Sequence, residues 1–258
     1  MRAELYGEGQ PALDDPAELF HEASKLHPAL AHRQGAGLAR LAANDELQRA
    51  AAAASRCNPQ LPSHPLPPPL RARCSLWDAL ARRTSRVAFP AAGLSERTLA
   101  TLLDAGYGRR DDGRRTVPSG GALYPLELLV AAHEVHGVPR GLHRYDVHPH
   151  ALEEHALGDP WPALERACPL PEILAGGAAA LLVLAVFGRT RFKYGLRGYR
   201  FALLEAGHVV QNVVLAAAAL EVAALPWGGY FDARLDALAG VDGVEESVVY
   251  AVVLGGDA

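Results

Sequence analysis

One long apolar segment limits what this chain can fold into. Residues 199–222 read YRFALLEAGHVVQNVVLAAAALEV, and apolar side chains lie around most of the circumference of a helix with this sequence. Such a helix is expected to be buried on several sides, so the rest of the fold must pack around it. The polar residues Gln211 and Asn212 need hydrogen-bond partners if they are buried there.

The segments around this helix predict a mixture of helices and strands. Ser75 and Ser95 are typical N-caps, and they precede helices in SLWDALARRTSR and SERTLATLLDAGYG. The apolar face of the first of these helices is formed by Leu76, Trp77 and Leu80. Strands are predicted in LELLVAAHEV, in the hairpin GLHRYDVHPHALEEH, in AAALLVLAVFG and in VVYAVVLGG near the C-terminus. Because helices and strands do not alternate strictly, the sequence predicts an α+β fold and not a doubly wound parallel sheet.

The N-terminal part predicts an extension in front of the main domain. DDPAELFHEASKL and GLARLAANDELQRAAAAAS both have helical patterns. Six prolines then fall between Pro59 and Pro69, which predicts an extended arm that lies on a surface. We therefore expect residues 1–73 to form a helical extension with a Pro-rich arm, and residues 74–258 to form the main domain.

Composition argues against several classes of protein. The net charge is −4 with 21% charged residues, so neither a basic balance nor a nucleic-acid partner is expected. No signal peptide is visible, and the longest apolar run, from Ala178 to Phe187, is too short to span a bilayer, so we expect a cytoplasmic protein without a membrane partner. The three cysteines, Cys57, Cys74 and Cys168, fit neither a zinc pattern nor a disulfide framework, and no metal site is predicted.

Two kinds of motif could contact a ligand. RRTSR, from Arg82 to Arg86, joins three guanidinium groups to two hydroxyls, a combination that can hold a phosphate or simply complement the end of a helix. VPSGGALYPLE, from Val117, and PWGGYF, from Pro226, contain glycine pairs that allow a backbone to approach a ligand closely or merely to turn.

A third motif, RFKYGLRGYRF, could carry acid–base chemistry. Lys193 and Tyr194 stand just before the long apolar helix, and Lys25 is the only other lysine in an arginine-rich chain. Lysine and tyrosine can transfer protons when their surroundings tune them, although a capped helix with an ion pair from Glu205 explains the same residues.

Taken together, these motifs resemble one family in order and spacing. RRTSRVAF, PSGGALYPLELLV, KYGLRGYRFALLEAGHVVQNVVLAAAAL and PWGGYF are similar to the SagB-type dehydrogenases of the nitroreductase superfamily, and ELFHEASKL is similar to their leading segment. The resemblance implies a nitroreductase-like fold with a central mixed or antiparallel sheet flanked by helices. It also implies an intertwined homodimer with FMN bound at the dimer interface.

The resemblance assigns roles to particular residues. Lys193 and Tyr194 match a Lys-Tyr pair that is taken to be catalytic. The residues expected to contact FMN are Arg82, Arg83, Thr84, Arg86, Pro118, Ser119, Gly120, Gln211, Gly228 and Gly229. The PSGG residues would approach from the partner subunit, and Arg86 would face the pyrimidine side of the flavin. The chain lacks the basic residue that many relatives carry after the last strand, so Arg82 would hold the phosphate largely alone.

The implied reaction is the oxidation of thiazoline or oxazoline rings in a ribosomally made precursor peptide to aromatic azoles. A base, Tyr194 or Lys193, would take the Cα proton, hydride would pass from Cβ to flavin N5, and O2 would reoxidise the flavin. A complex with the cyclodehydratase that makes the rings is a further implied partner. The alternatives are an NAD(P)H-dependent nitroreductase, a peptide oxidase that forms dehydroamino acids, and a non-catalytic scaffold subunit.

Overall fold

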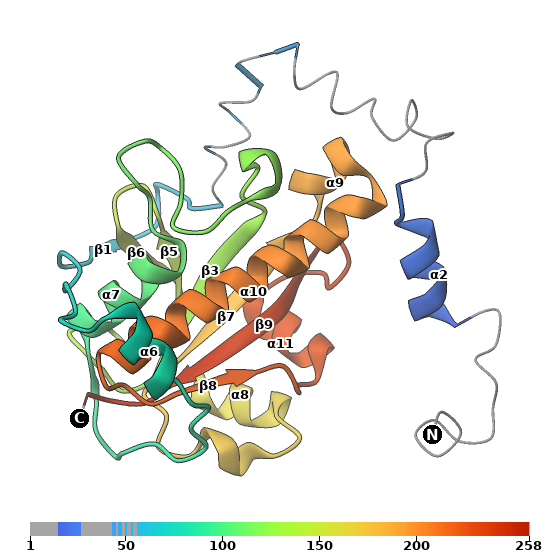
Figure 1. Ribbon diagram of the computed structural model, residues 1–258. Helices are drawn as coiled ribbons and strands as arrows, with labels where there is room; N and C mark the ends of the chain where they lie inside the picture. The colour runs from blue at the N-terminus through green and yellow to red at the C-terminus, as the bar shows by residue number, and fades with distance from the viewer. Residues whose placement is uncertain are drawn as a thin grey trace.

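The computed structural model describes residues 15–26, 43, 44, 46, 47, 50, 53 and 56–257 (Figure 1). Its centre is a seven-stranded sheet in which each neighbouring pair is antiparallel. In spatial order the strands are β1 (Ser63–Pro65), β6 (Ala151–Leu157), β5 (Gly141–Asp146), β3 (Leu126–Ala132), β7 (Ala179–Val186), β9 (Glu246–Leu254) and β8 (Ala224–Trp227). A separate parallel pair joins β2 (Leu94–Ser95) to β4 (Val135–His136). The α+β prediction is confirmed, and the sheet is antiparallel throughout.

Two helices, α7 (Glu96–Tyr107) and α10 (Leu196–Ala219), pack on the first face of the sheet, and α10 crosses it in front of β7 and β9 (Figure 1). The short helix α6 (Leu76–Arg82) packs on α10. The predicted caps are confirmed, because Ser75 accepts from the amide of Asp78 and Ser95 from the amide of Thr98. Alternate side chains of β3 and β7 pack into this layer, as the two-residue period of a strand requires.

The second face carries smaller helices. α8 (Trp161–Ala167), the 3-10 turn η3 (Pro171–Leu174) and α11 (Asp232–Ala239) pack against the opposite side chains of the same strands. β3 and β7 are therefore buried on both faces, which explains why both read as continuous apolar runs in the sequence.

The long helix α10 is less completely buried than its sequence predicts. By length and composition it could cross a membrane, but it packs on the sheet and on α7 as a core helix. Its outer face leaves Leu203 and Leu204 exposed, Leu204 by 61%. The apolar face of α6 is also turned outward, with Trp77 exposed by 77%, since only Ala79 of this helix is buried. Apolar side chains on both α6 and α10 are thus left without a cover in the single chain.

The Pro-rich arm lies along the sheet, as predicted for an extended segment. Its strand β1 pairs with β6 at one edge, and the other edge strand is β8. Each edge strand contains a proline, Pro65 in β1 and Pro226 in β8. Just before β1, the amide of Arg56 donates to Glu127 Oε1 at 3.1 Å, and the amide of Asn58 donates to Glu153.

The first N-terminal helix is observed and is held by α10. In the last turn of α2 (Pro16–Ala23), the carbonyl of His21 accepts from Arg200 at 2.6 Å, and Phe20 packs edge-on against Tyr199 with ring centroids 5.2 Å apart. The second predicted N-terminal helix, in residues 37–55, lies almost wholly outside the described residues. The division at residue 73 stays a prediction.

Candidate active site

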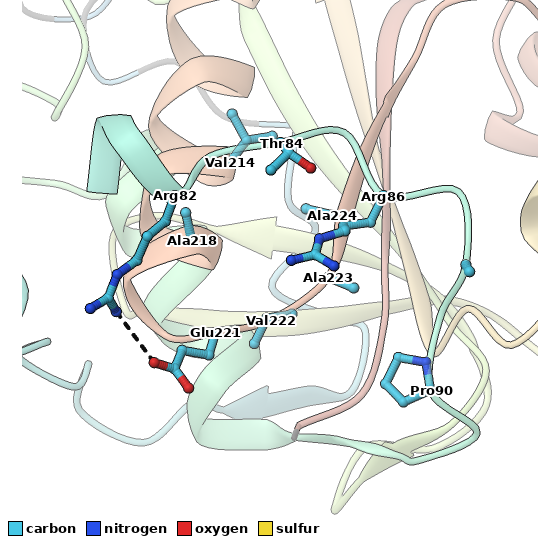
Figure 2. Close-up of a pocket in the computed structure, with 11 residues that line it drawn as sticks. Arg82, Thr84, Arg86, Pro90, Val214, Ala218, Glu221, Val222, Ala223 and Ala224 are labelled. Atoms are coloured by element: carbon cyan, nitrogen blue, oxygen red, sulfur yellow. Dashed lines mark hydrogen bonds and ion pairs between the residues drawn. The ribbon is translucent and has the colours of Figure 1, made fainter. Parts of the chain in front are cut away.

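The RRTSR segment forms one wall of an open pocket. Arg82 ends α6, and Thr84 and Arg86 follow in the loop that leads away from it. These three residues line a cavity of about 530 Å³ whose other walls come from the end of α10 and from the turn into β8 (Figure 2). The apolar part of the lining is Ala88, Pro90, Val214, Ala218, Val222, Ala223 and Ala224. Arg83, which caps α6, is not among the lining residues.

One of the two arginines that line the pocket forms an ion pair with a residue of the pocket wall. Arg82 Nη1 lies 3.3 Å from Glu221 Oε1 at the mouth of the pocket (Figure 2). Glu221 has a φ of +61°, a conformation that costs a residue with a side chain some strain. Arg86 is fixed through its backbone, which donates to the carbonyl of Ala224 at 3.0 Å. Two guanidinium groups and a hydroxyl thus face a space that has the size and chemistry to accept a phosphate and an adjoining apolar ring.

Lys193 and Tyr194 lie at the other end of α10. They form the C-terminal end of a short helix, α9 (Gly188–Tyr194), and do not simply precede the long helix. Gly195, with a φ of +57°, makes the turn between the two helices. The ammonium of Lys193 lies 5.0 Å from the centroid of the Tyr194 ring, and that ring packs edge-on against Phe201 at 4.9 Å. Aromatic packing therefore fixes the tyrosine beside the lysine.

The PSGG loop meets this pair within the same chain. A Cβ built on Gly121 would lie 2.4 Å from Lys193 Nζ and 2.6 Å from the Tyr194 hydroxyl oxygen. A Cβ on Gly120 would lie 3.1 Å from the Phe201 ring. The two glycines let the loop approach the reactive side chains more closely than another residue would allow. The structure thus brings together two motifs that lie about seventy residues apart in the sequence.

A buried polar group beneath the loop was missed in the sequence. Glu205, on α10, is 2% exposed, and its Oε1 accepts from the Tyr107 hydroxyl at 2.7 Å. Burial raises the pKa of Glu205 to about 7, while Ser119, Tyr107 and Arg115 act in the opposite direction. Burial, followed by the charge of Glu205, raises the pKa of Tyr107 well above its usual value. The alternative explanation, an ion pair from Glu205 on a capped helix, is not observed among the described residues, where Tyr107 is its hydrogen-bond partner. The sequence contained a signal for this buried site, because a lone glutamate on the inner face of an apolar helix must find hydrogen-bond partners.

The remaining predicted residues lie apart from both groups. Gly228 and Gly229 follow β8, at the end of this strand remote from the pocket, and Trp227 Nε1 donates to the Gly229 carbonyl at 3.1 Å. Gln211 is exposed on α10, and Asn212 donates to the carbonyl of Ala105 at 3.1 Å. Pro118 is exposed at the start of the PSGG loop. Within the described residues, no cluster of His, Cys, Asp and Glu could hold a metal ion.

The sequence matches the profile of the Nitroreductase family over residues 79–256. A candidate nitroreductase of Methanocaldococcus jannaschii, MJ1384, is 35% identical over 61% of this chain and 80% of its own length. The microcin B17-processing protein McbC of Escherichia coli is 35% identical over 54% of each chain. The trifolitoxin-processing protein TfxB of Rhizobium leguminosarum is 33% identical over 43% of this chain. This chain spans only about half of McbC and 31% of TfxB.

Two solved structures illustrate the fold that this chain shares. The E. coli microcin synthetase complex McbBCD, with truncated pro-MccB17 bound, contains a chain that matches this one with a TM-score of 0.60 and 24% identity, over 100% of this chain and 98% of that one. A nitroreductase-like protein of Desulfovibrio desulfuricans in complex with FMN matches with a TM-score of 0.51 and 23% identity, over 71% of this chain and 86% of that one. At these identities the likeness shows the fold.

Proposed function

Because this chain belongs to the nitroreductase family, we propose that it is an FMN-dependent dehydrogenase that oxidises azoline rings in a ribosomally made precursor peptide to aromatic azoles. The observation that carries the proposal is the convergence of Lys193 Nζ and the Tyr194 hydroxyl on Gly121 of the PSGG loop. A general flavin reductase needs no lysine and tyrosine held side by side at such a point. Two relatives, McbC and TfxB, are named as the processing proteins of microcin B17 and of trifolitoxin, which supports this choice.

The RRTSR pocket fits the phosphate end of FMN. Arg82, Thr84 and Arg86 supply two cations and a hydroxyl, and the apolar lining beside them suits the start of a ring system. A fold relative that binds FMN supports this choice of cofactor. When bound, FMN supplies a two-electron acceptor that O2 can return to its oxidised form. Arg86 would also place positive charge where a reduced, anionic flavin is stabilised.

One chain alone does not assemble both halves of this site. Phe201, beside the PSGG loop, and Val214, in the pocket wall, are separated by thirteen residues of α10, or about 20 Å along its axis. A single flavin ring does not span that distance. Two copies packed along α10 in opposite directions would bring the pocket of one copy to the loop of the other. The uncovered apolar surface on α6 and α10 supports this homodimer.

The chemistry proposed for the site begins with a proton. The Cα–H of an azoline is acidified by the adjacent C=N bond, and either Tyr194 or Lys193 is placed to accept the proton. Phe201 holds the tyrosine ring by an edge-on contact, which keeps its hydroxyl at the loop. Gly120 and Gly121 leave room for the peptide ring to enter above the loop backbone. The residues of this chain thus orient the substrate and move one proton, while the bound cofactor takes the electrons.

The substrate and partners follow from the same proposal. We infer that the substrate is a precursor peptide whose Cys, Ser or Thr residues a cyclodehydratase has already converted to azolines. The E. coli microcin synthetase complex McbBCD, solved with truncated pro-MccB17 bound, contains a chain of this fold and is therefore a precedent for its assembly with other proteins. We propose a corresponding contact between this chain and its own cyclodehydratase.

An NAD(P)H-dependent nitroreductase is the second candidate function. The observation in its favour is the similarity to MJ1384, which extends over 80% of that chain. The two functions separate under anaerobic conditions, because NAD(P)H rapidly bleaches the flavin of a nitroreductase. An azoline dehydrogenase is bleached by its azoline peptide instead.

The decisive experiment is oxidation of an azoline-containing peptide by the purified, FMN-loaded protein, followed by mass spectrometry. We expect a loss of two hydrogens per ring, and we expect Lys193→Ala to retain FMN but lose the activity. Lys25→Ala is the matched control, because Lys25 lies just after the end of α2 and pairs with Glu22. A colourless protein that FMN cannot reconstitute, or unchanged turnover of Lys193→Ala, would show that the proposal is wrong.

A further inference from the structure

The buried carboxyl of Glu205 has no role in the proposed reaction so far. It lies on the inner face of α10, one turn after Phe201, and is shielded from solvent. The Tyr107 hydroxyl donates to its Oε1, and this hydroxyl in turn accepts from the amide of Leu126 at 3.3 Å. Among the residues that the structure describes, Oε2 has no hydrogen-bond partner. Burial of a glutamate that is not fully hydrogen-bonded costs free energy of folding, so a function for this residue is expected.

The charged and titratable groups around Glu205 come from two other segments. The guanidinium of Arg115 stacks on the Tyr107 ring at 4.2 Å and on the Tyr124 ring at 4.9 Å. The amide of Arg115 also donates to the Tyr124 hydroxyl at 3.2 Å. Glu205, Tyr107, Arg115 and Tyr124 thus form one cluster, which we call the Glu205 cluster. It joins α7 and α10 to both sides of the PSGG loop.

Ser119 links the Glu205 cluster to the loop itself. Its hydroxyl oxygen accepts from the amide of Tyr124, a member of the cluster, at 2.9 Å, and the Ser119 carbonyl accepts from the amide of Ala122 at 3.1 Å. Ser119 therefore holds the two ends of residues 119–124 together. It is also one of the groups that lower the pKa of Glu205 and so favour the ionised carboxylate.

The loop that Ser119 closes has a strained backbone. Gly121 has a φ of +67°, and two residues that carry a Cβ also lie in the left-handed region, Ala122 at +53° and Tyr124 at +44°. Such conformations persist only where the surroundings hold them, and they gather at functional sites. The strained turn presents Gly121 to Lys193 Nζ and to the Tyr194 hydroxyl. A relaxed loop would not keep this contact.

We propose that Glu205 is a positioning residue that, through the other members of its cluster and the bond from Tyr124 to Ser119, holds the strained 119–124 loop against Lys193 and Tyr194. The inference rests on the proposed function for its effect on turnover, but not for its effect on the loop. Glu205 does not touch the reacting atoms. It determines where the loop backbone lies, and the loop backbone determines how much room the substrate ring has beside the two reactive side chains.

The test uses three variants of the full chain, loaded with FMN. Glu205→Leu removes the acceptor, Glu205→Gln keeps an acceptor oxygen in the same place, and Ser119→Ala removes the link at the loop. Ser119 is partly exposed, so Ser119→Ala should fold even if Glu205→Leu does not. Ser247→Ala is the matched control, because Ser247 also donates to a buried carboxylate, Asp236, but on the other face of the sheet.

The first readout is amide hydrogen exchange of the peptide covering residues 116–125, which needs no substrate. We expect exchange about two- to tenfold faster in Glu205→Leu and Ser119→Ala, the effect of losing one ordinary hydrogen bond, with little change in Glu205→Gln and Ser247→Ala. The second readout is azoline-peptide oxidation. In the two loop-weakened variants kcat should fall by about 10- to 100-fold with a smaller change in KM, since a displacement of about 1 Å can cost that much.

The two proposals fail in different ways. If the wild-type protein binds FMN but oxidises no azoline peptide, the proposed function is wrong. The comparison of hydrogen-exchange rates would still test the role of Glu205. Loop exchange at the wild-type rate in both Glu205→Leu and Ser119→Ala would overturn the role of Glu205. The same holds if Glu205→Gln lowers kcat as much as Glu205→Leu, because the acceptor oxygen would then be irrelevant.

Discussion

Lys193 and Gly121 are so close that a single methyl group on the glycine would reach within 2.4 Å of the lysine Nζ. The backbone of Gly121 also has a φ of +67°, which residues with side chains rarely adopt. Two independent constraints, steric and conformational, therefore act on one position. They make the PSGG loop a wall of the reactive site and not merely a turn before β3.

Gly121→Ala tests this wall directly. We expect it to destabilise the protein by about 1–2 kcal/mol through the left-handed φ, and to lower azoline-peptide turnover by about 100-fold because the tips of Lys193 and Tyr194 must move. FMN content should stay close to that of the wild type. Gly188→Ala is the control, since a Cβ there meets nothing within 4 Å. Urea unfolding and mass-spectrometric turnover measure both effects, and normal turnover of Gly121→Ala would contradict the geometry.

Glu221 is expected to compete with FMN for Arg82. Exposed ion pairs of this kind contribute at most about 1 kcal/mol, so Glu221→Gln should tighten FMN binding by up to about fivefold. Arg82→Ala should weaken binding by roughly tenfold or more, the usual effect of losing a charged hydrogen bond. In the Arg82→Ala background, Glu221→Gln should have no effect. Fluorescence titration of FMN gives all four affinities, and a benefit of Glu221→Gln that persists without Arg82 would exclude the competition.

The raised pKa of Glu205 predicts a pH dependence of stability. Between the ordinary value of 4.5 and about 7 the folded state retains a proton that the unfolded state has released, so stability falls as pH rises through this window. The effect is at most about 3 kcal/mol. Glu205→Gln carries no titrating group there. Its free energy of unfolding minus that of the wild type should therefore rise from pH 4.5 to pH 7 and level off above, as measured by urea unfolding across this range. A constant difference would show that Glu205 titrates normally.

Leu204 is expected to lie in the interface between two copies. Leu204→Arg places a charge on the exposed apolar face of α10, so we expect a folded monomer with weakened FMN binding. Val244→Arg is the control, because Val244 is similarly exposed but lies in the turn before β9. Light scattering after size-exclusion chromatography measures the mass, and circular dichroism checks the fold. A Leu204→Arg dimer that binds FMN normally would place the interface elsewhere.

The sequence was sufficient for most of the fold because its signals were local. Ser75 and Ser95 cap the helices that they were predicted to cap, and the apolar runs became β3, β7 and β9. Less local features were harder to read. The outward turn of Trp77 depends on what the sheet leaves uncovered, and the short helix α9 is separated from α10 only by the φ of Gly195. The spacing of apolar residues indicates neither the outward orientation of Trp77 nor the break between α9 and α10.

The candidate site was foreseen as a set of motifs but not as an arrangement. The resemblance named Lys193, Tyr194 and the PSGG loop, and the structure adds that Gly121 meets both side chains within one chain. The Glu205 cluster escaped prediction because Glu205 lies about eighty to a hundred residues after the other members and meets them only when α7 packs on α10. Contacts of this range are set by tertiary packing and have no spacing rule.

The prolines at the two ends of the sheet have a consequence for assembly. Pro65 and Pro226 each remove a backbone donor from an outermost strand, so neither end can recruit a further strand along its full length. Growth of the sheet into fibres is thereby discouraged at both ends. Two copies of the chain would then associate through side chains on the helical layer. Such contacts can form an oligomer of fixed size, whereas pairing between edge strands can continue without limit.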